Sequence, residues 1–166
     1  MADEAKSTFL VSVDREPIVI ALQGRVSYMN CAPLRKLMDK LIEDRNAQFV
    51  IDLGECTGID STVLGILAHV AMEVRKKQPP GYVQLCRLNE RNWELVKNLG
   101  LNHLMDCRSE LHDATAADKA QALEAGDSAS KQTILEAHQK LMQVDKGNID
   151  KFQDVVSYLK KQVEQE

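Results

Sequence analysis

The chain has 166 residues, of which 44% are hydrophobic but only 4% aromatic, and its formal net charge is −4. This length supports one domain with its own core plus an appendage, and a core built on aliphatic side chains suits mixed α/β packing. No segment concentrates Lys or Arg, which argues against nucleic-acid binding because such proteins need a basic surface. The polar start does not resemble a signal peptide, and no apolar run approaches the ~20 residues of a membrane span. We therefore expect a cytoplasmic protein.

Two apolar runs and a helix are predicted in the first quarter of the chain. Residues 9–13 are prone to form a strand, and the apolar run 18–22 is typical of a buried strand that ends at Gly24. Asn30 is expected to cap a helix that has Pro33 in its first turn. The apolar stripe of this helix consists of Leu34, Leu37, Met38, Leu41 and Ile42.

The middle of the chain continues the alternation. Residues 49–53 are predicted to be a strand, residues 54–59 a loop, and residues 61–77 a helix. The helix ends at the Pro-Pro-Gly sequence of residues 79–81, and a fourth strand follows at residues 82–88.

The predicted domain closes with short elements. Asn89 or Asn92 can start a helix that Gly100 ends, a last strand is expected within residues 101–107, and a closing helix is expected at residues 115–125. Helices that regularly separate strands favour an α/β fold, with a mixed sheet of four to five strands covered by helices.

The last third of the chain, residues 126–166, is predicted to be a helical hairpin attached to a domain of residues 1–125. A linker precedes two apolar stripes, and Gly147-Asn148 reads as a helix stop followed by a new cap. The first stripe is Ile134, Ala137, Leu141 and Val144, and the second is Ile149, Phe152, Val156, Leu159 and Val163. Such stripes must be covered, either by the domain or by another chain. We favour the second arrangement, a homo-oligomer or a partner contact through the hairpin.

The cysteines and histidines do not suggest a metal or cofactor. Cys31, Cys56, Cys86 and Cys107 lie more than twenty residues apart, without a close pair of the kind that zinc sites use. We therefore expect reduced and mostly buried thiols, with no metal and no cofactor.

The start of the predicted helix 61–77 is the most informative position. Asp60 or Ser61 stands at its N-cap, where free backbone amides and the helix dipole favour negative charge. A phosphoryl group on Ser61 would add close to two negative charges, which would disturb a docked partner. The alternative is that Ser61 and Thr62 only cap the helix. This helix is apolar on two sides, so it is either wholly buried or partly covered by another molecule.

A strand, a short loop and Asp60-Ser61-Thr62 opening a helix together resemble the STAS family, named after sulfate transporters and anti-sigma factor antagonists. The resemblance spans about residues 8–125 and includes the stretches 24–26, 33–35 and 95–101. Bacterial antagonists commonly carry Gly where this chain has Val63. This difference places a branched side chain near any kinase that must reach Ser61.

The resemblance implies a regulatory protein-binding module. It implies Ser61 as the phosphoacceptor, with Thr62 as a second candidate, and an anti-sigma factor or switch-type serine kinase and a serine phosphatase as partners. The residues that it assigns to partner binding are Asp60, Ser61, Thr62, Val63, Leu64 and Ile66. Two alternatives stay open, namely a constitutive scaffold without phosphorylation and a carrier of a small ligand or lipid.

Catalytic chemistry is not expected. His69 is the only histidine close to Ser61 in sequence, and eight residues along one helix separate them by ~12 Å. No glycine-rich loop followed by Lys-Ser or Lys-Thr is present to hold a phosphate. We therefore expect a protein that is not an enzyme.

Overall fold

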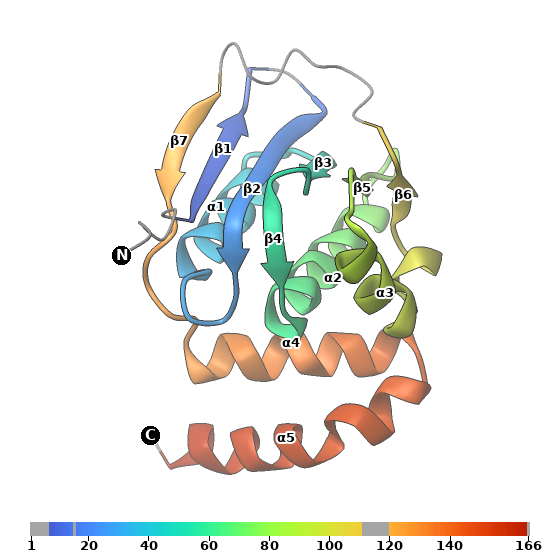
Figure 1. Ribbon diagram of the computed structural model, residues 1–166. Helices are drawn as coiled ribbons and strands as arrows, with labels where there is room; N and C mark the ends of the chain where they lie inside the picture. Colours follow the sequence, from blue (N-terminus) through green and yellow to red (C-terminus); the bar gives the residue numbers. More distant parts are fainter. Residues whose placement is uncertain (1–6, 15, 111–119, 166) are drawn as a thin grey trace.

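A computed structural model describes residues 7–14, 16–110 and 120–165 (Figure 1). Its strands are β1 (Thr8–Ser12), β2 (Ile18–Val26), β3 (Gln48–Asp52), β4 (Cys56–Ile59), β5 (Tyr82–Cys86), β6 (Asp106–Arg108) and β7 (Gln121–Glu124). Its helices are α1 (Ala32–Glu43), α2 (Ser61–Arg75), α3 (Glu90–Asn98), the 3-10 turn η1 (Leu101–His103), α4 (Lys131–Val144) and α5 (Gly147–Glu164). The predicted α/β class, a mixed sheet with helices packed on it, is confirmed.

The sheet has the strand order β6-β5-β3-β2-β1-β7, and β4 pairs with β2 outside this path. Strands β2, β3, β5 and β6 run parallel, whereas β1 is antiparallel to both of its neighbours. Strand β2 lies at the centre, and its Ile18, Ile20 and Leu22 are fully buried. Helices α1 and α2 lie behind the strands in Figure 1, as right-handed crossovers between parallel strands require.

The sheet has more strands than the four to five expected. Strand β2 does not end at Gly24 but continues to Val26 through an irregularity where Gly24 has φ +80°. This extension pairs with β4, which occupies part of the segment expected to be a loop, with Val26 opposite Ile59. The Gly24 amide also donates to the Glu55 carbonyl oxygen, at 2.9 Å. Glycine fits this position because left-handed backbone costs it no side-chain clash.

The predicted closing helix is wrong over the residues that can be compared. Residues 111–119 lie outside the described part of the chain, and Gln121–Glu124 form β7 instead of a helix. β7 pairs with β1, where Leu123 stands opposite Phe9. Its residues favour a helix by intrinsic propensity. However, the free edge of β1 offers backbone hydrogen-bond partners, and a prediction from local sequence does not take these distant partners into account.

Two predicted caps also differ from the structure. The N-cap of α1 is Cys31, and Asn30 instead closes the turn before it by accepting from the Ser27 amide. Asn148 does not start α5 as a cap. Its buried amide group donates to the carbonyl oxygens of Leu99, at 2.9 Å, and Leu141, at 2.7 Å. This side chain therefore joins the hairpin to the segment after α3.

The C-terminal hairpin packs on the domain of the same chain. Figure 1 shows α4 lying between α5 and the rest of the molecule. Ala137 and Leu141 from the first predicted stripe belong to the main core, and Ile134 and Val144 pack against it. The preference for a contact with another chain is therefore wrong for α4, because the face of α2 takes up this stripe within one chain. No described helix has both the length and the apolar character that crossing a membrane requires.

Candidate functional site

Asp60 fixes the start of α2 and ties it to a neighbouring turn. Its Oδ1 accepts from the Val63 amide at 3.0 Å, which is an N-cap hydrogen bond. Its Oδ2 accepts from the Tyr28 amide at 2.8 Å. One carboxylate thus holds the first turn of α2 against the turn that joins β2 to α1.

Ser61, the first residue of α2, is half-buried and bonds to the C-terminal hairpin. Its Oγ lies 3.0 Å from His138 Nε2, and His138 Nδ1 lies 2.7 Å from the Ile134 carbonyl oxygen. Because a carbonyl oxygen only accepts, Nδ1 carries the proton, and in a neutral imidazole Nε2 then accepts from the Ser61 hydroxyl. The His138 ring is 6% exposed and meets Phe152 of α5 edge-on, with the ring centroids 5.0 Å apart.

A histidine that accepts from a serine hydroxyl is one part of a nucleophilic site. Here the other ring nitrogen bonds to a main-chain carbonyl oxygen instead of a carboxylate. The hydroxyl points toward α4, and neither Ser61 nor His138 lines the cavity that Asp60, Arg25 and Arg91 help to form. The Ser61–His138 hydrogen bond therefore links α2 to α4.

The other residues assigned to partner binding lie mostly inside the protein. Thr62 is 3% exposed, and Val63, Leu64 and Ile66 are fully buried. One side of α2 packs against the sheet and α1, and another side packs against α4. This accounts for the two apolar faces of α2. Val63 therefore points into the core and does not stand between solvent and Ser61. Of the six residues, only Asp60 and Ser61 have substantial exposed surface.

Two exposed apolar residues beside Asp60 were not identified from the sequence. Tyr28 is 48% exposed and Met29 is 61% exposed, in the turn between β2 and α1. The linker before α4 fixes this turn, because the Ala129 amide donates to the Tyr28 carbonyl oxygen and Ser128 Oγ to that of Met29. Two large apolar side chains in a turn were a usable signal, since turns favour polar residues.

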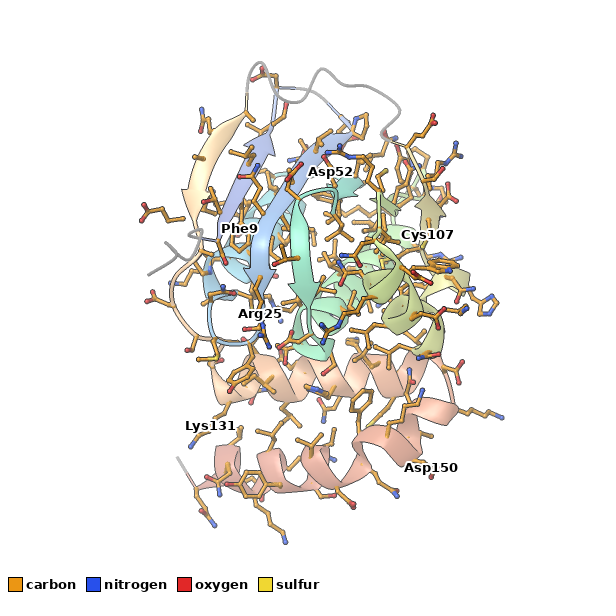
Figure 2. The ribbon with its side chains drawn as sticks, viewed as in Figure 1. Phe9, Arg25, Asp52, Cys107, Lys131 and Asp150 are labelled. Carbon is orange, nitrogen blue, oxygen red and sulfur yellow. The ribbon has the colours of Figure 1, made fainter. Side chains whose placement is uncertain are left out.

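A cavity of about 400 Å³ opens between the end of β2, β4 and the start of α3. Its polar lining comes from Arg25, Ser27, Thr57, Asp60, Arg91 and Asn92. Figure 2 shows Arg25 at the end of β2 that lies toward α4. Within the described part of the chain, neither guanidinium group forms an ion pair. The two arginines outnumber the one carboxylate, which already accepts two hydrogen bonds, so the cavity suits an anionic group.

The thiols are held in their neutral form. All four cysteines are free, and only Cys107 is not fully buried. Burial, and then the nearby Asp60, raise the pKa of Cys31 to about 11. Burial likewise raises the pKa of Cys107 to about 11. Among the described residues, no group of three or more His, Cys, Asp or Glu side chains is arranged to hold a metal ion.

Solved structures of anti-sigma factor antagonists share this fold. One from Mycobacterium paratuberculosis is 24% identical, covers 70% of this chain and 96% of its own, and has a TM-score of 0.56. The antagonist SpoIIAA in its unphosphorylated form is 16% identical, with coverages of 66% and 94% and a TM-score of 0.52. SpoIIAA, the Bacillus cell fate determinant, in its phosphorylated form is 16% identical, with coverages of 61% and 92% and a TM-score of 0.50.

No curated protein matches the chain. The family model described as "Mlab, STAS domain" matches residues 9–106, more than half of the chain. The matched segment runs from β1 to the start of β6 and includes α2 with Ser61. Helices α4 and α5 lie beyond it. The chain therefore belongs to the STAS domain family.

Proposed function

We propose that the protein is a cytoplasmic, non-enzymatic regulator that works like an anti-sigma factor antagonist, binding a protein partner under the control of phosphorylation at Ser61. The unphosphorylated protein binds an anti-sigma factor or a switch-type serine kinase. The kinase ends this binding by modifying Ser61, and a serine phosphatase restores it. Among the solved structures with this fold, one antagonist is known in a phosphorylated and an unphosphorylated form, which supports the comparison.

The position of Ser61 carries the proposal. It is the first residue of a helix that Asp60 caps, and its hydroxyl is half-buried at the protein surface. A phosphoryl group at this end of the helix meets a favourable dipole, so the domain can carry it without unfolding. Thr62 is a poorer acceptor because its side chain is buried.

The surroundings of Ser61 offer a surface for a partner. Tyr28 and Met29 supply exposed apolar area next to Asp60. The cavity with Arg25 and Arg91 can take an acidic side chain of the partner. Apolar anchors beside a charged pocket are typical of protein-binding sites, whereas a metal or cofactor site needs a different set of groups.

Quantitative affinity capture from the source cells tests this function. Wild-type protein and the variants Ser61→Ala, Ser61→Asp and Ser157→Asp serve as baits, and the bound proteins are identified by mass spectrometry. Ser157 is exposed on α5, so its variant controls for added charge alone. We expect a kinase-like or anti-sigma-like protein to bind the wild type, Ser61→Ala and Ser157→Asp equally, and Ser61→Asp at least tenfold less.

Affinity capture and native mass spectrometry of the protein together separate the alternatives. A partner that binds Ser61→Asp as well as wild type would favour a constitutive scaffold. The exposed Val155 and Tyr158 on α5 are the observation that favours such a role. A small molecule that stays bound in native mass spectra would favour the carrier, for which a depression of about 230 Å³ beside Leu88, Trp93 and Cys107 is a candidate site.

A further inference from the structure

Helix α4 lies so close to α2 that the two backbones nearly touch. A Cβ added at Gly65 would come within 2.7 Å of the Ala137 Cβ and closer still to the Ala137 carbonyl oxygen. One turn earlier on α2, Ser61 bonds to His138, the next residue of α4. The two contacts come from consecutive residues of α4 and lie one turn apart on α2, so α4 covers the first turns of α2, including Ser61.

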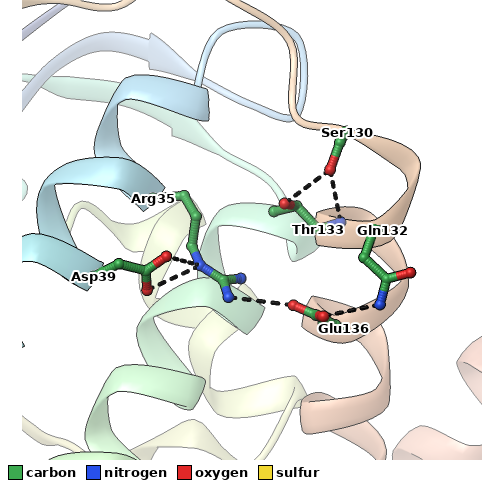
Figure 3. A network of polar contacts seen from close by, with 6 residues as sticks. All are labelled: Arg35, Asp39, Ser130, Gln132, Thr133 and Glu136. Atoms are coloured by element: carbon green, nitrogen blue, oxygen red, sulfur yellow. Dashed lines mark hydrogen bonds and ion pairs between the residues drawn. The ribbon is translucent and has the colours of Figure 1, made fainter.

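Besides the buried hydrogen bonds of Asn148, polar contacts fasten α4 and α5 at the edges of this cover. Figure 3 shows Arg35 of α1 reaching Glu136 of α4, with Nη2 and Oε2 3.2 Å apart, while its Nε bonds to Asp39. Ser130 caps α4 by accepting from the Thr133 amide. At the other end, Lys151 Nζ donates to the Asn98 carbonyl oxygen at 2.6 Å.

The hairpin also has an apolar core of its own. Leu135, Val156 and Leu159 form a cluster separate from the main core, with Phe152 and Val163 packed beside it. Ile149, the remaining member of the predicted stripe, is 41% exposed. A helix pair with its own cluster can keep its structure when its outer contacts change, which makes it a candidate for a separate opening unit.

The hairpin is an addition to the family module. The STAS match ends at residue 106, whereas the face of α2 that α4 covers lies inside the match. The covered face of α2 is therefore part of the matched module, and the helix that covers it lies outside the matched segment.

We propose that α4 is a displaceable occupant of a helix-binding face on α2, and that a phosphoryl group on Ser61 loosens it. The second half of this inference rests on the proposed function. The face would accept one kind of partner, an amphipathic helix with a small residue opposite Gly65, since any larger residue would meet the α2 backbone as a Cβ at Gly65 would meet Ala137. Such a helix competes with α4 for the same place.

The chemistry at His138 explains the loosening. Its Nδ1–H donates to the Ile134 carbonyl oxygen, so in a neutral imidazole Nε2 presents a lone pair to Ser61. A phosphoryl group there would place negative oxygens against a nitrogen lone pair in a half-buried site, and would remove the hydroxyl proton that bonds the two helices. Repulsion and bulk both push α4 away from the first turn of α2.

Hydrogen exchange of the full-length chain, read by mass spectrometry, tests this inference without any partner or kinase. The variants are Ser61→Asp and Gly65→Ala, with Ser157→Asp and Gly126→Ala as matched controls. Gly65→Ala pushes on Ala137 while favouring helix in α2, and a Cβ at Gly126 meets nothing within 4 Å. We expect amides of residues 131–164 to exchange at least tenfold faster in both test variants, while those of β2, β3 and β5 keep their wild-type rates in all four.

Three results would overturn the inference. In wild-type protein, residues 131–164 could exchange only as fast as the central strands, which would make the hairpin an integral part of the domain. Ser61→Asp could leave the exchange of α4 unchanged, which would show that negative charge at this position does not loosen α4. It could also slow that exchange, which would mean that a protonated His138 binds the new charge. Each of these results leaves the phosphorylation of Ser61 itself to be decided separately, by partner capture and by mapping of the phosphate.

Discussion

His138 Nε2 lies 3.0 Å from Ser61 Oγ, although the two residues are 77 positions apart in the sequence. The bond joins the C-terminal hairpin to Ser61, the residue that we propose as the phosphoacceptor. We infer that this bond makes the conformation of α4 depend on whether Ser61 carries a phosphoryl group.

Replacing His138 with alanine should destabilise the protein by about 2 kcal/mol. The change removes a hydrogen bond, leaves the Ser61 hydroxyl without this partner, and opens space beside Phe152. The free energy of unfolding from urea titration measures the effect. His103→Ala is the matched control, because His103 is exposed, and it should shift the midpoint little. Equal effects of the two changes would show that the His138 contact adds no stability.

Replacing Asp60 with alanine should cost about 1–2 kcal/mol, since the change removes the N-cap of α2. It also frees the Tyr28 amide, so the turn that carries Tyr28 and Met29 should exchange its amides faster. Asp60→Asn retains a side-chain oxygen toward Val63 and should recover much of the lost stability. If the asparagine variant were as unstable as the alanine variant, the charge and not the cap would be the important feature.

Much of this region could be predicted from the sequence because its signals are local. The cap at Asp60 or Ser61, of which the structure shows Asp60, and the stripe through Ala137 and Leu141 depend on residues within a few turns of one another. His138 could not be assigned to Ser61, because their contact depends on how α4 crosses α2. For the same reason, β4 was expected to be a loop, since its partner is the extension of β2 beyond Gly24.

Stability should fall as the pH drops below about 6.5, in part because of His69. Burial, followed by the charges of Arg35 and Lys140, lowers the pKa of His69 in the folded protein, against the opposing effects of Glu73 and Asp39. The unfolded chain therefore binds the proton first, so the stability is complete above the unfolded pKa of about 6.5 and is lost as the pH falls toward the folded value. His69→Gln should flatten the dependence of the urea midpoint on pH between 5 and 7.5. An unchanged slope would exclude His69 as its source.

The Cys31 thiol should react slowly with iodoacetamide. A pKa of about 11 leaves only about a thousandth of it as thiolate at pH 8, so alkylation of the native protein should be roughly a hundredfold slower than that of a free thiol. Peptide mapping after timed alkylation measures the rate, and the same protein in denaturant should react fully. Rapid labelling of Cys31 in the folded protein would show that the start of α1 opens readily.

Phosphate mapping on protein isolated from its own cells, with and without stress, tests the role of Ser61 by intact-mass and peptide mass spectrometry. We expect a phosphate on Ser61 whose occupancy changes between the two conditions, with the buried Thr62 unmodified. A Ser61 that is never phosphorylated under any condition would contradict this expectation, and Ser61 would then be a residue that only fastens α4 to α2.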